Sequence, residues 1–172
     1  WGLKLESYGF EENRITVIGS PEVTSEDDRL TYRWDGRMEE WFVNDHRGLE
    51  HGFLLRERPP AHRGGQSLEV RMTVRGGVRP TLSADGQTVH FLDKDGASTV
   101  NYGGLKVWDA DGTVLPSRFV IDSGNTLVLR VEESAARYPL TIDPIAQQAY
   151  LKASNTGSLD WFGWSVAVSG DT

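Results

Sequence analysis

The stretch Leu68-Glu-Val-Arg-Met-Thr-Val-Arg75 decides the fold of this chain. Apolar and polar residues alternate along it, which is typical of a strand with one buried face, because successive side chains of a strand point to opposite faces. A register shift of one residue would bury two arginines and a glutamate. We therefore predict that the apolar set (Leu68, Val70, Met72, Val74) faces the core and the polar set (Glu69, Arg71, Thr73, Arg75) faces solvent.

Further runs with the composition of strands lie on both sides of this stretch. Runs rich in β-branched and aromatic residues predict strands at 3–10, 14–18, 30–34, 40–43, 52–56, 88–92, 105–108, 118–121, 126–131 and 138–142. Turn sequences lie between them: Asp35-Gly36, Asp85-Gly86, Asp95-Gly96, Asp111-Gly112 and Ser123-Gly124-Asn125. We therefore predict an all-β chain, an antiparallel β-sandwich or an open barrel, with short helical turns only at 26–29 and 132–137.

The composition excludes several classes of function. The 172 residues carry 18 Lys and Arg against 25 Asp and Glu, a net charge of -7, so a nucleic acid would be repelled and we expect no such partner. Apolar runs are far shorter than the about 18 residues of a membrane helix, so we expect no membrane insertion. Cysteine is absent, which excludes disulfides, thiol catalysis and thiolate metal ligands.

Two segments interrupt the strand pattern. Residues 57–66 contain Pro59-Pro60 and Gly64-Gly65 and predict a long exposed loop. After Asp143-Pro144 the composition changes to Ala, Gln, Ser and Asn. We therefore predict an all-β N-terminal domain at 1–144 and the beginning of a second unit at 145–172.

The second unit contains the pair Phe162-Gly163, with Asp160 two residues before it and Ser165-Val-Ala-Val-Ser-Gly-Asp-Thr172 after it. On these residues, the segment 149–172 resembles the opening of a bacterial FG-GAP repeat, the blade motif of integrin-α-like β-propellers. The resemblance implies the first strands of a propeller-type repeat, an incomplete blade, whose interaction residues are Asp160, Trp161, Phe162, Gly163 and Trp164. The motif's second half and its calcium loop are missing from the match, so no calcium site is transferred.

Four upstream motifs are similar to an N-terminal domain that precedes FG-GAP repeats in large bacterial surface or secreted proteins. They are Leu30-Thr-Tyr-Arg-Trp34, Glu40-Trp-Phe-Val-Asn44, Gly48-Leu-Glu-His-Gly-Phe53 and Tyr138-Pro-Leu-Thr-Ile-Asp-Pro144. This resemblance implies an exported, multidomain protein, located outside the cell or on its surface, in which the domain carries no recognised catalytic residues.

Two Asp-x-Asp-Gly sequences are candidate calcium ligands: Asp93 with Asp95, and Asp109 with Asp111. Calcium prefers several carboxylate and carbonyl oxygens on one tight turn. Neither sequence continues with the acidic residue that a full calcium loop needs late in the loop, and Asp-Gly is also a common hairpin turn. Hairpin geometry is our interpretation, and we expect no required cofactor, with calcium as the alternative.

Other candidates for catalysis or metal binding are weak. Glu39 and Glu40 could suggest a glycosidase pair, but adjacent strand residues point to opposite faces. His46, Glu50 and His51 could hold zinc, yet their spacing matches no helical motif, and a surface loop explains them better. No nucleophile, base and orienting group can be assembled, so we expect no enzyme.

The six tryptophans suggest either core packing or a sugar-binding surface. We expect at least two of Trp34, Trp41 and Trp108 to lie in the core. The leading hypothesis is a noncatalytic extracellular structural or adhesive module that precedes a β-propeller. The alternatives are a carbohydrate-binding module with a polysaccharide partner, a hydrolase, and a strand-exchanging subunit whose tail pairs as an edge strand with a neighbouring domain or another chain.

Overall fold

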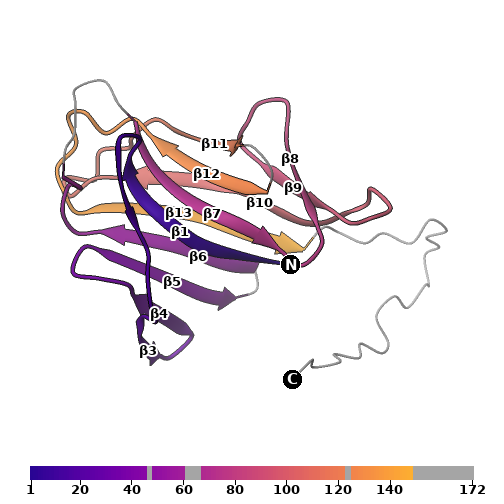
Figure 1. Cartoon of the computed structure of the whole chain (residues 1–172), viewed down its shortest axis with the longest axis horizontal. Coiled ribbons are helices and arrows are strands. Elements are labelled where there is room, and N and C mark those ends of the chain that lie inside the picture. The colour runs from indigo at the N-terminus through magenta and orange to yellow at the C-terminus, as the bar shows by residue number, and fades with distance from the viewer. Residues whose placement is uncertain (46–47, 61–66, 123–124, 149–172) are drawn as a thin grey trace.

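Two antiparallel sheets form the fold in a computed structural model that describes residues 1–45, 48–60, 67–122 and 125–148 (Figure 1). The five-stranded sheet has the order β11-β12-β7-β1-β2. Its strands are β1 (Gly2–Phe10), β2 (Asn13–Thr16), β7 (Leu68–Arg75), β11 (Ser117–Asp122) and β12 (Thr126–Val131). All of its neighbouring strands run antiparallel.

The eight-stranded sheet has the order β3-β4-β5-β6-β13-β10-β9-β8. Its strands are β3 (Glu22–Glu26), β4 (Arg29–Arg33), β5 (Met38–Asp45), β6 (Gly48–Leu55), β8 (Arg79–Leu82), β9 (Val89–Leu92), β10 (Ser98–Trp108) and β13 (Leu140–Gln148). The described strands form two separate open sheets, as expected for the predicted antiparallel sandwich. The described residues include no helix long and apolar enough to cross a membrane.

The core lies between the two sheets and confirms the register predicted for β7. Leu68, Val70 and Met72 are fully buried, and Val74 is almost so. They meet inward side chains of both sheets, which include Leu5, Tyr8, Phe53, Phe91, Tyr102, Phe119, Leu129 and Ile142. Burial of this one continuous apolar cluster is the main stabilising term of the fold.

Glu69, on the opposite face of β7, corrects the prediction that the polar set faces solvent. It lies on the outer face of the sheet, but its side chain is only 5 % exposed. Its carboxylate accepts hydrogen bonds from Arg130 Nη2 at 2.6 Å and Arg71 Nη1 at 3.1 Å, and Arg14 Nε is 3.5 Å away. Arg71 comes from β7 itself, Arg130 from β12 and Arg14 from β2, so sheet assembly decides the burial of Glu69.

Four of the five predicted turns are hairpin corners of the structure, and the fifth, at 123–125, lies mostly outside the described residues. Gly86, Gly96 and Gly112 have positive φ, the conformation for which a turn selects glycine. The predicted helical turns are wrong. Residues 27–28 form the tight turn of the β3–β4 hairpin, and residues 132–137 form an irregular connection with a turn at 134–135.

Two strands escaped the sequence pattern, and several others, β5, β6, β10 and β13 among them, run further than predicted. β3 is exposed along its whole length, and β8 contains Pro80 at the edge of its sheet. β13 continues through Pro144 to Gln148 and pairs with both β6 and β10. It therefore crosses residue 144, where we placed the end of the first domain. The expected loop at 57–66 lies mostly outside the described residues.

Candidate functional site

The flank of the sandwich beside β1 contains a stretch of unpaired strand edge. β2 pairs with β1 only over Ser7–Phe10, and Val17 N donates to Glu6 O just before that. Over Gly2–Leu5, no described strand pairs with this edge of β1, whose other edge is bonded to β7. An open edge presents backbone donors and acceptors that can receive a further strand.

Two cavities lie under this edge, between β1 of one sheet and β4–β6 of the other. The first, of about 230 Å³, is lined by Leu3, Lys4, Leu5, Tyr32, Trp34, Glu40, Phe42 and Arg75. The second, of about 240 Å³, is lined by Trp1, Gly2, Leu3, Phe42, Leu49 and His51. Leu3 and Phe42 line both, so the cavities are neighbours. We call the unpaired edge of β1 and these two cavities the open flank.

A buried polar network forms the inner wall of the open flank. Trp34 Nε1 donates to Glu40 Oε2 at 2.8 Å, and His51 Nε2 lies 2.8 Å from Glu40 Oε1. The hydroxyl of Tyr102 lies 2.9 Å from His51 Nδ1. In the neutral tautomer of His51 that donates from Nε2 to Glu40, Nδ1 accepts the Tyr102 proton. Burial, and then the charges of Glu40 and Asp143, raise the pKa of Tyr102, which keeps that proton in place.

Glu39 and Glu40 cannot act as a glycosidase pair, because they point to opposite faces of β5, as the alternation of strand side chains predicted. Glu40 faces inward and bonds to Trp34 and His51. Glu39 faces outward and accepts hydrogen bonds from Arg33 Nε at 3.1 Å and Arg56 Nη2 at 2.7 Å. The two carboxylates therefore lie on opposite faces of one sheet and cannot flank one bond.

The zinc candidates are not brought together. Glu50 and His51 are successive residues of β6 and point to opposite faces, while His46 lies outside the described residues. The surface-loop interpretation is wrong for His51, which is 2 % exposed and stacks on Phe42 with ring centroids 4.5 Å apart. Among the described residues, no group of three or more His, Asp or Glu side chains could hold a metal ion.

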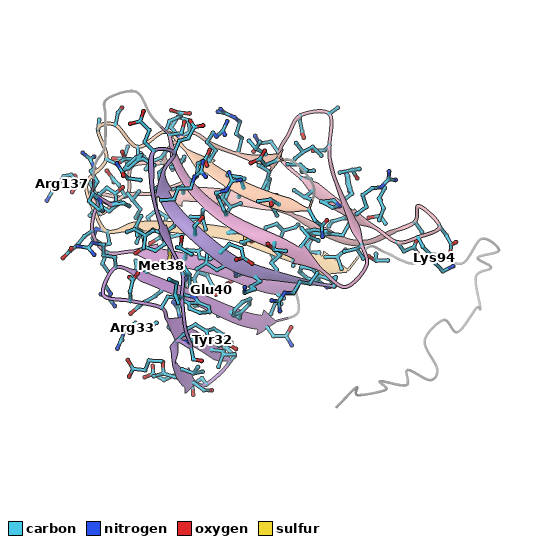
Figure 2. All side chains as sticks on the ribbon, viewed as in Figure 1. Tyr32, Arg33, Met38, Glu40, Lys94 and Arg137 are labelled. Carbon is cyan, nitrogen blue, oxygen red and sulfur yellow. The ribbon has the colours of Figure 1, made fainter. Side chains whose placement is uncertain are left out.

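The calcium candidates are hairpin turns, as predicted. Asp93 Oδ1 accepts the backbone N–H groups of Asp95 and Ala97, and the Asp95 carboxylate pairs with Lys94. The two turns lie at opposite ends of the molecule, as the positions of Lys94 and Arg137 in Figure 2 show. They therefore cannot combine into one site.

The turn of Asp109 and Asp111 is tied to Arg137. Asp109 Oδ1 accepts the N–H groups of Asp111 and Thr113, and Asp109 Oδ2 accepts that of Arg137. These bonds, led by the one from Arg137, lower the pKa of Asp109. Asp111 pairs with Arg137 Nη1 at 2.8 Å. The backbone and this arginine therefore occupy carboxylate oxygens that a cation would need.

The strand tryptophans are less central than predicted, because none of the three belongs to the cluster between the sheets. Trp34 packs against the core, and Trp41 is 6 % exposed. Trp41 is buried on the outer face of the sheet, under the guanidinium of Arg29. Trp108 is half-buried.

Sequence reasoning missed the lining of the open flank. Aromatic residues of this lining, such as Tyr32 and Phe42, have the sequence pattern of ordinary strand residues, because the pattern of one strand does not reveal a cavity between two sheets. The pair Glu40 and His51 could have been detected from the sequence. Alternation places both on the buried face of their strands, where an ionisable side chain needs a hydrogen-bond partner.

The remaining predicted interaction residues, Asp160, Trp161, Phe162, Gly163 and Trp164, lie outside the described residues, as does the tail strand at 165–169. Residues 145–172 match the family model described as FG-GAP repeat. Searches of curated proteins and of solved structures found no match to this chain. The described residues therefore form an all-β sandwich, and the sequence that matches the FG-GAP repeat begins within its last strand, β13.

Proposed function

We propose that this chain is a noncatalytic structural or adhesive module of an exported modular protein, and that it stands directly before a β-propeller. One observation carries the proposal. β13 lies inside the eight-stranded sheet, between β6 and β10, and the FG-GAP match begins at Ile145, within that strand. The sandwich and the repeat thus share a strand. Such a junction holds the start of the repeat at a fixed place on the sandwich.

The polar groups of the open flank support a noncatalytic role. Glu40, His51 and Tyr102 are each less than 5 % exposed and bond to one another. A general acid or base must reach the proton that it transfers, and these groups are turned toward each other inside the wall. The arrangement is that of a satisfied buried network, which fixes the positions of β5, β6 and β10.

Export is supported by the repeat, because FG-GAP repeats are typically extracellular. Protease treatment of intact source cells, followed by detection of the sandwich with an antibody, tests this location. We expect the protein to be cleaved on intact cells or recovered from the medium. A protein that is protected in intact cells and digested only after lysis would refute the proposal.

Carbohydrate binding is the second candidate function, favoured by the lining of the first cavity. Tyr32 and Trp34 stack there with centroids 6.3 Å apart, beside Glu40. Aromatic faces with a few polar groups suit a sugar ring. On affinity gels that contain polysaccharide, this candidate predicts retardation that Tyr32→Ala abolishes. The control Trp108→Ala alters an aromatic residue outside the cavity lining and leaves retardation unchanged.

A further inference from the structure

We propose that the first cavity of the open flank binds an acidic sugar, a uronate ring of an anionic polysaccharide, with the ring against Tyr32 and the carboxylate on Arg75. The proposal rests on the second candidate function, carbohydrate binding, and names the chemical class of its ligand. Three observations carry it: the charge of the five-stranded sheet, an arginine without a partner beside the cavity, and an aromatic wall held in place by its neighbours.

The five-stranded sheet is cationic although the chain is acidic. Its strands carry six Lys and Arg residues against three Asp and Glu residues, whereas the whole chain has a net charge of -7. The six are Lys4, Arg14, Arg71, Arg75, Arg118 and Arg130, and the three are Glu6, Glu69 and Asp122. A local excess of positive charge attracts an anion to this sheet, while the acidic remainder of the chain repels it. The sheet therefore favours an anionic partner.

Arg75 is the cation of this set that is left for a ligand. Each of the other five has a side-chain nitrogen within 3.5 Å of a carboxylate oxygen. Arg75 lines the first cavity, is exposed, and forms no ion pair with any described residue. A guanidinium presents its N–H donors in a planar fork that matches the two oxygens of a carboxylate. Arg75 is therefore placed to hold the carboxylate of a ligand in the cavity.

Tyr32 supplies an aromatic face in a fixed position. Its ring centroid lies 6.3 Å from that of Trp34 with 21° between the planes, and Phe42 meets it edge-on with centroids 5.8 Å apart. All three residues line the first cavity. An aromatic face of this kind suits the apolar face of a sugar ring. The Tyr32 hydroxyl has no hydrogen-bond partner among the described residues, so it can bond to a sugar hydroxyl.

The size of the cavity and its inner wall suit one ring of a longer chain. Its volume of about 230 Å³ is below the roughly 300–1,000 Å³ of ordinary small-molecule sites. Glu40 also lines it, but both of its oxygens are bonded, to Trp34 and His51. The backbone of Gly2–Leu5 has one edge without a described strand partner, and these N–H and C=O groups can bond to sugar hydroxyls. The neighbouring rings of a polysaccharide would lie along this edge.

Binding of the full chain to immobilised polyuronates tests the proposal. The probes are polygalacturonate, alginate and hyaluronate, each beside its carboxyl-reduced neutral form, with inorganic polyphosphate as an anion that has no sugar ring. We expect a polyuronate to bind more tightly than its reduced form. Arg75→Gln should weaken that binding about tenfold or more, because a charge-assisted pair is lost, and should leave the affinity for the reduced form unchanged.

Arg79→Gln is the matched control. Arg79 is also exposed and has no ion pair with a described residue, but it lies on β8 and outside the lining of the cavity. This variant should bind as the wild type does, and both arginine variants should keep the melting temperature of the wild type. Tyr32→Ala should weaken the binding of the polyuronate and of its reduced form alike, since stacking does not depend on the carboxylate.

Four results would overturn the proposal. They are no binding of any polyuronate, equal affinity for a polyuronate and its reduced form, an equal loss in Arg75→Gln and Arg79→Gln, and equally tight binding of polyphosphate. Binding of the reduced forms without a preference for the acidic ones would refute only the acidic class and would keep carbohydrate binding as a function. The absence of all binding would refute both, and would leave the structural role before a propeller to its own test.

Discussion

Gly52→Ala should destabilise the sandwich by pushing Trp41 off its place on β6. Gly52 pairs directly with Trp41 across the β5–β6 ladder. A Cβ added to Gly52 would lie 2.0 Å from Cζ2 and 2.1 Å from Cε2 of the Trp41 ring, well inside van der Waals contact. The glycine is therefore needed for the close approach of the ring, and its φ lies outside the positive range.

Two limits bound the cost. If the ring shifts but stays covered, overpacking costs about 1–3 kcal/mol. If the ring leaves the surface, it loses about 150–250 Å² of burial, or about 4–6 kcal/mol at about 25 cal/mol/Å², besides its contact with Arg29 at 4.4 Å. We expect about 2–4 kcal/mol, a large share of a typical total of about 5–15 kcal/mol.

Urea denaturation measures this cost, with Gly36→Ala as the matched control. A Cβ at Gly36 would meet nothing within 4 Å. In Gly52→Ala the urea midpoint should fall by about 1 M or more, given slopes of about 1–3 kcal/mol/M. In a Trp41→Ala background the same change should cost less than about 0.5 kcal/mol, since the ring is gone. A midpoint for Gly52→Ala equal to that of Gly36→Ala, or an undiminished cost in the Trp41→Ala background, would refute the reasoning.

Three further predictions concern the core, the charges and the metals. Val70→Asp should unfold the domain, because Val70 is fully buried and an unpaired buried charge costs several kcal/mol; an unchanged melting temperature would contradict the register. Burial acts to raise the pKa of Glu39, but hydrogen bonds from Arg56 and Arg33 outweigh it and leave this pKa below 4.5. The contribution of a lowered carboxylate pKa is present above the unfolded value and lost as pH falls through the folded one. Glu39→Gln should therefore melt earlier than wild type at pH 7, and the two should converge as the pH falls through the lowered pKa of Glu39. A gap that does not change with pH would rule this account out. Removal of calcium with a chelator should leave the melting temperature unchanged, because the carboxylate of Asp93 is bonded to backbone N–H groups; a metal at about 100 times its dissociation constant would add about 2.7 kcal/mol, so a fall of several degrees would show that a metal is bound.

The sequence pattern predicted the structure correctly where a feature depends on a single strand or a single turn. The alternation of residues 68–75 predicted the buried face of β7, and the Asp-Gly pairs predicted hairpin corners, since both depend on residues adjacent in sequence. β3 was missed because none of its five residues is buried, and its pairing with β4 leaves no alternation to detect. Pro144 suggested a break, yet it lies where the register of β13 against β10 shifts, a place that tolerates a missing N–H.

The sequence by itself determined the all-β class, which residues of the core strands face inward, and the match of residues 145–172 to an FG-GAP repeat. These depend on composition, on the two-residue alternation of apolar side chains and on short motifs. Only the tertiary structure decided that Glu69 is covered by three arginines, that His51 joins Glu40 and Tyr102, and that the edge of β1 stays open above two cavities. Each of these features joins side chains from strands far apart in the chain. Their contacts exist only after both sheets have formed and packed.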